Sequence, residues 1–300
     1  MEIGNWSSTA EVNEHYRQAR RLGIESNVLE LELLGFTIIE PEKASPNGLG
    51  ERLTEATYAL LKREDAADVA LNTFEKSNVD GRHVFHLINK DPVFVEAMLN
   101  PVVMTLARLA TGERGRLNAT VCFAKKGLAK PTMLHCDATE CPAPMPAFGH
   151  FINISYLVTD YTVANGTLAI VPGSNRWCRP PTPIEQPKAF GGVNDDIAIP
   201  VIAKAGSIVA FNGNTWHGAY PKTDPNADRI HLSYGFSKAY VQPGENYDDI
   251  PDSMAELYGP EFAQLVGKYD WKGWRTEGPN FERQLAGEKA RMAARALAAE

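Results

Sequence analysis

The middle of the chain alternates between short runs of β-branched and aromatic residues and clusters of residues that form turns. Runs of this length predict short β-strands, and the Gly, Pro, Asn and Asp between them predict tight connections. Many short strands at regular spacing are typical of a sandwich or a jelly-roll barrel, so this pattern constrains the fold strongly. The predicted strands cover residues 117–123, 148–157, 168–171, 197–202, 207–212 and 230–236.

Helical patterns lie on both sides of this region. Apolar and polar positions are interleaved there, and Gly35 is a stop signal for the first helix. Asp91 and Pro92 form a suitable N-cap and first-turn pair for a later one. The predicted helices cover 9–34, 48–74, 91–112 and much of 251–300, and two further strands cover 35–39 and 84–88.

We find no internal repeat and no change in composition that would mark a linker. The sequence therefore predicts one domain over residues 1–300, with a mostly β core and flanking helices. Its expected parts are a helix-rich region over 1–114, a jelly-roll, cupin-like core over about 115–240, and C-terminal helices over 251–300.

Composition excludes several classes of partner. The chain is 44% hydrophobic and 22% charged, as in ordinary soluble proteins, and its net charge is -7. Without a long run of Lys or Arg, neither a nucleic acid nor an anionic membrane is expected as the main partner. No apolar run approaches the roughly 18 residues of a spanning helix, and residues 1–8 lack the pattern of a signal peptide. We expect a soluble, cytoplasmic protein.

The cysteines point to reduced thiols. Their spacing contains no Cys-x-x-Cys pair, which argues against a structural zinc site, and four cysteines in 300 residues do not make a disulfide scaffold. They are Cys122, Cys136, Cys141 and Cys178.

Residues 131–137 contain a His-x-Asp motif on a predicted short strand. Alternate residues of a strand share a face, so His135 and Asp137 would project in the same direction, with Cys136 on the opposite side. An imidazole and a carboxylate side by side are two of the three ligands of a facial-triad Fe(II) site. His-x-Asp alone is common by chance, so a metal site needs supporting residues further along the chain.

His217 and Arg229 come after the predicted strand at 207–212. A jelly roll could bring His217 next to the His-x-Asp motif, which would leave three coordination positions open for chemistry. Arg229, His231 and Ser233 share a face of the next strand. A guanidinium inside a barrel is costly unless an anion meets it, and a dicarboxylic cosubstrate bound at its other end to the metal would do so.

This spacing resembles that of the Fe(II)- and 2-oxoglutarate-dependent dioxygenases, and its details are similar to the phytanoyl-CoA dioxygenase family. The matching segments lie before the barrel, in a strand–turn–strand after the metal motif, and around Trp216-His217-Gly218. Together they span roughly residues 30–240. The segments are 85–94, 157–166 with 171–174, and 216–218.

The resemblance implies a double-stranded β-helix in which 2-oxoglutarate chelates iron, dioxygen binds, and the cosubstrate is decarboxylated to succinate while a substrate C–H bond is oxidised. His135, Asp137 and His217 match the family's iron ligands. Arg229 matches the residue that holds the distal carboxylate of 2-oxoglutarate, and Ser233 could assist it from the same face.

Two positions depart from the pattern of some fungal members. Thr132 stands where they have Gln, and Leu168 where they often have Thr. The polar surroundings of the cosubstrate must therefore differ, and we expect Thr132 or Asn153 to compensate. Asp137 argues against the halogenating relatives, in which a small residue replaces the carboxylate.

The remaining candidates are less specific. His231 could line the cosubstrate pocket or lie in the core, and Trp216 could form a pocket wall or fill the core. His83 and His86 should face opposite ways, and His150 has no supporting partner, so none of them is a good ligand candidate. An apolar mouth would fit a hydrophobic substrate such as a terpenoid, polyketide or acyl derivative. The apolar candidates are Met133, Met145, Phe148 and Trp216.

The sequence therefore predicts an enzyme that uses Fe(II), 2-oxoglutarate and O2 to oxidise a small organic molecule, most simply by hydroxylation. Desaturation, epoxidation and rearrangement stay open, as does a homodimer. Two alternatives from other classes are a cupin-like metalloenzyme that does not use 2-oxoglutarate and a non-catalytic jelly-roll binding module.

Overall fold

The computed structural model describes residues 7–66, 81–138, 141–194, 197–270, 272, 274 and 276–298. Its helices are α1 (Ser7–Arg21), α2 (Glu25–Leu34), α3 (Pro41–Ala44), α4 (Leu49–Ala66), α5 (Pro92–Met98), α6 (Pro101–Thr111), α7 (Asp252–Leu265) and α8 (Phe281–Ala298). Its strands are β1 (Phe36–Ile39), β2 (Arg82–Phe85), β3 (Arg116–Lys125), β4 (Thr132–His135), β5 (Phe151–Leu157), β6 (Leu168–Ile170), β7 (Ile199–Pro200), β8 (Ile208–Asn212), β9 (His217–Ala219) and β10 (Arg229–Ser237).

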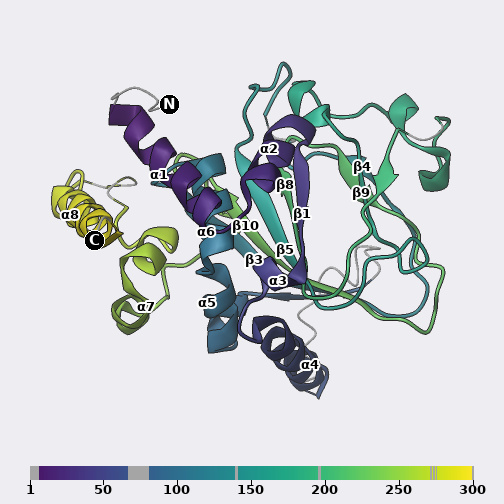
Figure 1. Ribbon diagram of the computed structural model, residues 1–300, viewed down its shortest axis with the longest axis horizontal. Helices are drawn as coiled ribbons and strands as arrows, with labels where there is room; N and C mark the ends of the chain where they lie inside the picture. Colours follow the sequence, from purple (N-terminus) through teal and green to yellow (C-terminus); the bar gives the residue numbers. More distant parts are fainter. Residues whose placement is uncertain are drawn as a thin grey trace.

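The strands form two antiparallel sheets. The larger sheet has six strands in the order β1-β8-β5-β10-β3-β2, and the smaller has four in the order β4-β9-β6-β7. Neighbours in each sheet are far apart in the sequence, as in a jelly roll. Helices lie on one side of the larger sheet and the smaller sheet lies on the other (Figure 1). The predicted fold class, a jelly-roll core with flanking helices, is confirmed.

Strand β10 shows why the larger sheet has two different faces. Its even-numbered positions are fully buried apolar side chains that pack with α5 and α6 in the main core. Alternation then turns its odd-numbered positions, which include Arg229, His231 and Ser233, towards the smaller sheet. The buried positions are Ile230, Leu232, Tyr234 and Phe236.

Two smaller apolar clusters position the smaller sheet. One lies between the sheets, where Ile170 of β6 packs with Val209 and Phe211 of β8. The other covers the outer face of the smaller sheet, where Leu134, Cys136 and Trp216 pack together. The expected outward position of Cys136 is thus observed.

Two predicted helices are broken. The prediction of one helix over 9–34 is wrong, because the chain turns at Gly23 (φ 64°) before α2 begins. The predicted helix over 91–112 is interrupted before Pro101, which has no N–H to continue it. Asn100 caps the second part by accepting a 2.9 Å hydrogen bond from the Val102 N–H.

Other boundaries shift by smaller amounts. The strand predicted over 84–88 ends at Phe85, because His86 adopts a left-handed conformation (φ 55°). Of the helix predicted over 48–74, residues 67–74 lie outside the described residues. Asp91 caps α5 as predicted, accepting a hydrogen bond from the Val93 N–H at 2.9 Å. Gly35 ends α2 with φ 81°, also as predicted.

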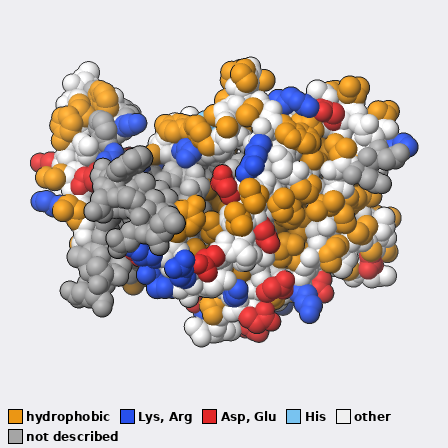
Figure 2. All heavy atoms as spheres, turned by 45° about the horizontal axis from the view of Figure 1, so that its top comes forward, with side chains coloured by type: hydrophobic (Ala, Val, Ile, Leu, Met, Phe, Trp, Pro, Cys, Tyr) orange, Lys and Arg blue, Asp and Glu red, His pale blue; other side chains and the backbone are white. Residues whose placement is uncertain are grey.

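Apolar side chains are common on the surface of the half that holds the smaller sheet (Figure 2). Trp177, Ile184, Val193 and Ile202 all belong to its long connections and are exposed. No single helix in the described ranges is long and apolar enough to cross a membrane. The bent pair α5 and α6 meets that test by length and composition alone.

Candidate metal centre

The site is built around two histidines on neighbouring strands. His135 at the end of β4 lies directly opposite His217 at the start of β9 in the antiparallel register. Their ring centroids are 4.3 Å apart. Side chains of directly opposed residues project to the same face of a sheet, so both imidazoles point in the same direction. Strand pairing therefore brings together two residues that are far apart in the sequence.

Asp137 completes the group just beyond β4. Its backbone N–H donates to the carbonyl of Gly213 at 2.8 Å, which ties the end of β4 to the turn before β9. Asp137 Oδ1 lies 3.5 Å from His217 Nε2. One ligand atom from each of His135, Asp137 and His217 lies within 4.8 Å of the other two. Two imidazoles and one carboxylate on one side of an ion are the ligand set of a non-haem Fe(II) triad.

Both histidines have their tautomer determined by the backbone. His135 Nδ1 donates to the carbonyl of Met133, and His217 Nδ1 donates to the carbonyl of Thr215, each at 2.9 Å. A carbonyl oxygen only accepts hydrogen bonds, so each Nδ1 carries the proton. Each Nε2 then keeps a lone pair for a metal, and these hydrogen bonds hold the rings as outer partners do in known metal sites.

The Asp137 carboxylate has its own orienting partner. Asn153 of β5 donates from Nδ2 to Asp137 Oδ2 at 2.5 Å, which leaves Oδ1 towards His217. The residue opposite Asn153 on β10 is Gly235, where a Cβ would lie 3.4 Å from the Asn153 carboxamide oxygen. Asn153 therefore lies in the outer layer of the site, in contact with the carboxylate ligand.

Burial keeps the second histidine neutral. His217 is 6% exposed, and desolvation lowers its pKa below the ordinary value, although the negative charge of Asp137 opposes that shift. A neutral imidazole is the form that binds a metal. The site is thus prepared to take a cation near neutral pH.

Arg229 begins β10 on the face that looks into the space between the sheets. Its side chain is buried, and its Nη2 donates to the Tyr161 hydroxyl oxygen at 3.4 Å. Its Nε is buried without a hydrogen-bond partner, and no ion pair to this guanidinium is found within the described part of the chain. A buried cation without an anion is costly, so this position fits an anionic ligand.

His231 and Ser233 lie beyond Arg229 along the same face. His231 stacks on Phe123, with ring centroids 4.9 Å apart, and has a buried Nδ1 without a partner. Desolvation, with a smaller effect of the Arg229 charge, holds its pKa well below the ordinary value. Ser233 lies opposite Ser155 of β5. A neutral ring and two hydroxyls thus line the strands next to Arg229.

The residues expected around the substrate separate into two groups. Met133 and Phe148 are exposed, at 45% and 53%. Trp216 and Met145 are buried in the cluster on the outer face of the smaller sheet. Trp216 lies on the other side from His217 because the side chains of successive residues alternate there, and Met145, from the connection before β5, packs in the same cluster. For Trp216, the core interpretation therefore replaces that of a pocket wall, and Met145 is likewise a core residue.

Three contacts were not anticipated. Tyr161 touches Arg229, Asn153 contacts Asp137, and Gln186 bonds to the strand that carries His135. Thr132, expected beside the cosubstrate, is exposed at the start of β4. A tyrosine or glutamine in a connecting segment has no pattern that distinguishes it from a surface residue, so no sequence signal marked these contacts.

The fold and the ligand set define a jelly-roll protein with a facial-triad metal centre. The family model of phytanoyl-CoA dioxygenase (PhyH) matches residues 31–229, and the chain belongs to that family of 2-oxoglutarate-dependent non-haem iron dioxygenases. Among curated relatives, dioxygenase af480 from Aspergillus fumigatus is 27% identical over 228 residues, which cover 75% of this chain and 70% of the relative.

Solved structures show the same fold. EctD from S. alaskensis, solved with 2-oxoglutarate and 5-hydroxyectoine, matches with a TM-score of 0.57 at 18% identity over 75% of this chain and 81% of that one. The epimerase SnoN, in complex with Fe3+, alpha ketoglutarate and nogalamycin RO, matches with a TM-score of 0.54 at 20% identity. That match covers 77% of this chain and 91% of SnoN.

Proposed function

We propose that this protein is an Fe(II)- and 2-oxoglutarate-dependent dioxygenase that oxidises, in the simplest case hydroxylates, a C–H bond of a small hydrophobic organic molecule. One observation carries the proposal. A His–Asp–His group with free Nε2 lone pairs and a buried, anion-free Arg229 occur in one jelly roll, on the strands that face each other. Membership of the family supports the same assignment.

In this proposal His135, Asp137 and His217 bind Fe(II). When bound, the iron supplies the redox chemistry that couples decarboxylation of 2-oxoglutarate to oxidation of the substrate by O2. The chain itself contributes geometry. The carbonyls of Met133 and Thr215 orient the two imidazoles, and three protein ligands leave coordination positions free for the cosubstrate and O2.

Arg229 is proposed to bind the distal carboxylate of 2-oxoglutarate. Its guanidinium already donates to Tyr161, and its free Nε can form a charge-assisted hydrogen bond to a carboxylate. Ser233 is a further donor on the same strand face. Thr132 is retained as a candidate beside the cosubstrate, and His231 as a candidate at the pocket wall.

The hydrophobic character proposed for the substrate rests on two exposed side chains near the site. Met133 of β4 and Phe148, which precedes β5, are exposed apolar side chains, and these two strands bear His135 and Asn153. Exposed apolar side chains beside a polar site favour a substrate with apolar surface. SnoN, which shares the fold, was solved in complex with nogalamycin RO.

The test is an anaerobic titration of the protein with Fe(II) and then 2-oxoglutarate, observed through the charge-transfer absorbance of the chelated cosubstrate. The proposal expects that band in the unsubstituted protein and its loss at the same 2-oxoglutarate concentration in Arg229→Ala. A cupin-like enzyme without 2-oxoglutarate would show iron binding but no band. A binding module would show neither, and its ligand affinity would not depend on His135.

We further propose that residues 1–300 work as one unit with a small-molecule partner, and that the protein is cytoplasmic. A homodimer stays open as a prediction. Size-exclusion chromatography with light scattering would measure the oligomeric state directly.

A further inference from the structure

A buried glutamine bonds to the strand that carries the first histidine. Gln186 is 5% exposed, and its side chain pairs with the backbone of Leu134. The Leu134 N–H donates to Gln186 Oε1 at 2.8 Å, and Gln186 Nε2 donates to the Leu134 carbonyl at 2.9 Å. Strand β4 is an edge strand of the smaller sheet. The carboxamide therefore supplies the pair of hydrogen bonds that a neighbouring strand would otherwise make.

The same connection also contacts the residue before the second histidine. Trp216 Nε1 donates to the carbonyl of Arg179 at 2.8 Å, and the Arg179 guanidinium lies over the Trp216 ring, 4.8 Å from its centroid. We call residues 179–186 the clasp. Leu134 and Trp216 immediately precede His135 and His217, so the clasp bonds to the backbone of one residue and the side chain of the other, each next to an imidazole.

The clasp is itself tightly bonded. Arg179 donates to both carboxylate oxygens of Glu185, at 2.8 and 2.6 Å. Thr182 and Glu185 form a capping box around a short 3-10 turn. A Cβ on Gly192 would lie 1.9 Å from the Gln186 carbonyl oxygen, so the returning chain approaches Gln186 as only glycine allows. One bidentate ion pair, a capping box and a close backbone approach hold the shape of this connection.

We propose that the clasp sets the relative position of the two histidine ligands and thereby the affinity of the site for iron, with Gln186 as its main positioning residue. This inference rests on the proposed iron site. Metal ligands need distances accurate to about 0.2 Å, and an edge strand with free backbone groups on one side does not hold such a position well. Outer partners of metal ligands typically contribute about 10–100-fold in affinity.

The experiment measures the Kd for Fe(II) anaerobically, by competition with a chromogenic chelator, in the full chain and in Gln186→Met. Methionine keeps the length of the side chain and removes both hydrogen bonds to Leu134. We expect Fe(II) binding to weaken about 10-fold.

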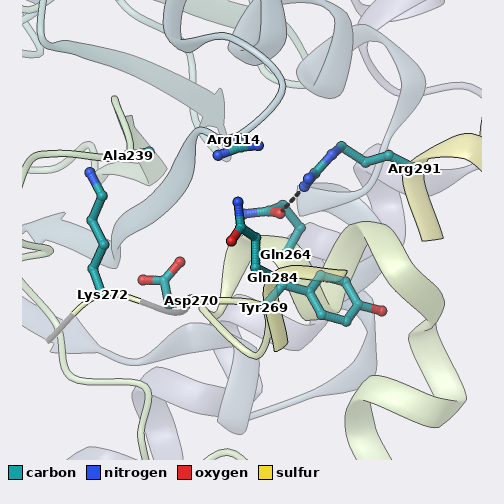
Figure 3. A pocket seen from close by; sticks show the side chains of 8 residues that line it. All are labelled: Arg114, Ala239, Gln264, Tyr269, Asp270, Lys272, Gln284 and Arg291. Atoms are coloured by element: carbon teal, nitrogen blue, oxygen red, sulfur yellow. Dashed lines mark hydrogen bonds between the residues drawn. The ribbon is translucent and has the colours of Figure 1, made fainter. Parts of the chain in front are cut away.

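The matched control is Gln264→Met. Gln264 is 6% exposed, comes from α7, and accepts one hydrogen bond from Arg291 of α8 at 2.8 Å. It lines a pocket between these helices (Figure 3), on the opposite side of the larger sheet from β4 and β9 (Figure 1). This variant should lose thermal stability and keep the Fe(II) affinity of the unsubstituted protein.

Trp216→Phe is a second variant that keeps an aromatic ring in the core, removes the hydrogen bond to Arg179 and reduces the ring area under the Arg179 guanidinium. Like Gln186→Met, it should weaken Fe(II) binding. If Gln186→Met does not fold, Trp216→Phe alone tests the clasp proposal. Unchanged Fe(II) affinity in the folded variants would overturn the clasp proposal and leave the proposed function standing. Failure of the unsubstituted protein to bind Fe(II) would overturn both.

Discussion

The guanidinium of Arg229 lies over the ring of Tyr161, with its central carbon 5.1 Å from the ring centroid, and donates a long 3.4 Å hydrogen bond to the Tyr161 hydroxyl. This contact orients a buried cation without neutralising it. Tyr161 is itself buried, and desolvation raises its pKa, so the hydroxyl stays protonated and cannot serve as the counter-ion. A buried guanidinium whose Nε has no partner fits the proposed carboxylate ligand.

Replacing Arg229 with an uncharged residue should weaken the binding of 2-oxoglutarate and leave the binding of Fe(II) unchanged. Arg229→Gln should weaken 2-oxoglutarate binding about 10–100-fold, the equivalent of one charged hydrogen-bonded contact. Tyr161→Phe should cost less, because the charge remains. Isothermal titration with 2-oxoglutarate in the presence of Fe(II) measures both. Equal affinities in Arg229→Gln and the unsubstituted protein would contradict the role of Arg229.

Asn153 provides a separate test of the carboxylate ligand. In Asn153→Leu the Asp137 carboxylate loses its orienting hydrogen bond, and the affinity for Fe(II) should fall about 10-fold. Asn153→Ser, which is shorter but can still donate through a water, should lose less. The affinity for 2-oxoglutarate in iron-saturated protein should change little. A selective loss of 2-oxoglutarate binding would instead return Asn153 to the cosubstrate shell.

Metal binding should stabilise the fold. A site that forms only in the native state gives about 2.7 kcal/mol at a free Fe(II) concentration about 100 times its Kd. Anaerobic Fe(II) should therefore raise the melting temperature, and EDTA should reverse the change. His135→Ala and Asp137→Ala should melt at the same temperature with and without Fe(II). If they respond to Fe(II) like the unsubstituted protein, the metal binds elsewhere.

His83 predicts a pH dependence of stability. Burial, with a smaller effect of the Lys125 charge, lowers the pKa of His83 from 6.5 to about 4. Between these values the unfolded chain takes up a proton that the folded protein does not, so stability is highest above pH 6.5 and decreases towards pH 4. The contribution is at most about 3 kcal/mol.

The measurement for His83 is urea denaturation of the metal-free protein from about pH 7 to about pH 4, which spans both pKa values. His83→Phe keeps a ring against Phe123, whose centroid lies 4.6 Å from that of the His83 ring, and cannot be protonated. It should show a shallower loss of stability over this range than the unsubstituted protein. The other buried histidines are present in both proteins, so parallel curves would mean that burial does not lower the pKa of His83.

Local sequence signals were most reliable where the chemistry is local. Asp91 capped its helix and Gly35 ended one, because capping and left-handed conformations depend on a few neighbouring atoms. Pro101 is a local signal of the same kind, because α6 begins there. The apolar periodicity continues across this position, so the sequence predicted one helix where the structure has two. The strand at His217 was missed because three residues are too few for a period-2 pattern.

The types and order of the site residues can be read directly from the chain. The available ligand chemistry follows from the His-x-Asp motif, the later His and the later Arg, because it depends only on the types of side chain. Their convergence depends on long-range pairing. His135 meets His217 through the register of β4 and β9, and Arg229 is buried through the alternation of β10. Contacts such as Gln186 to Leu134 and Asn153 to Asp137 arise from packing between distant segments, whose energy no local pattern encodes.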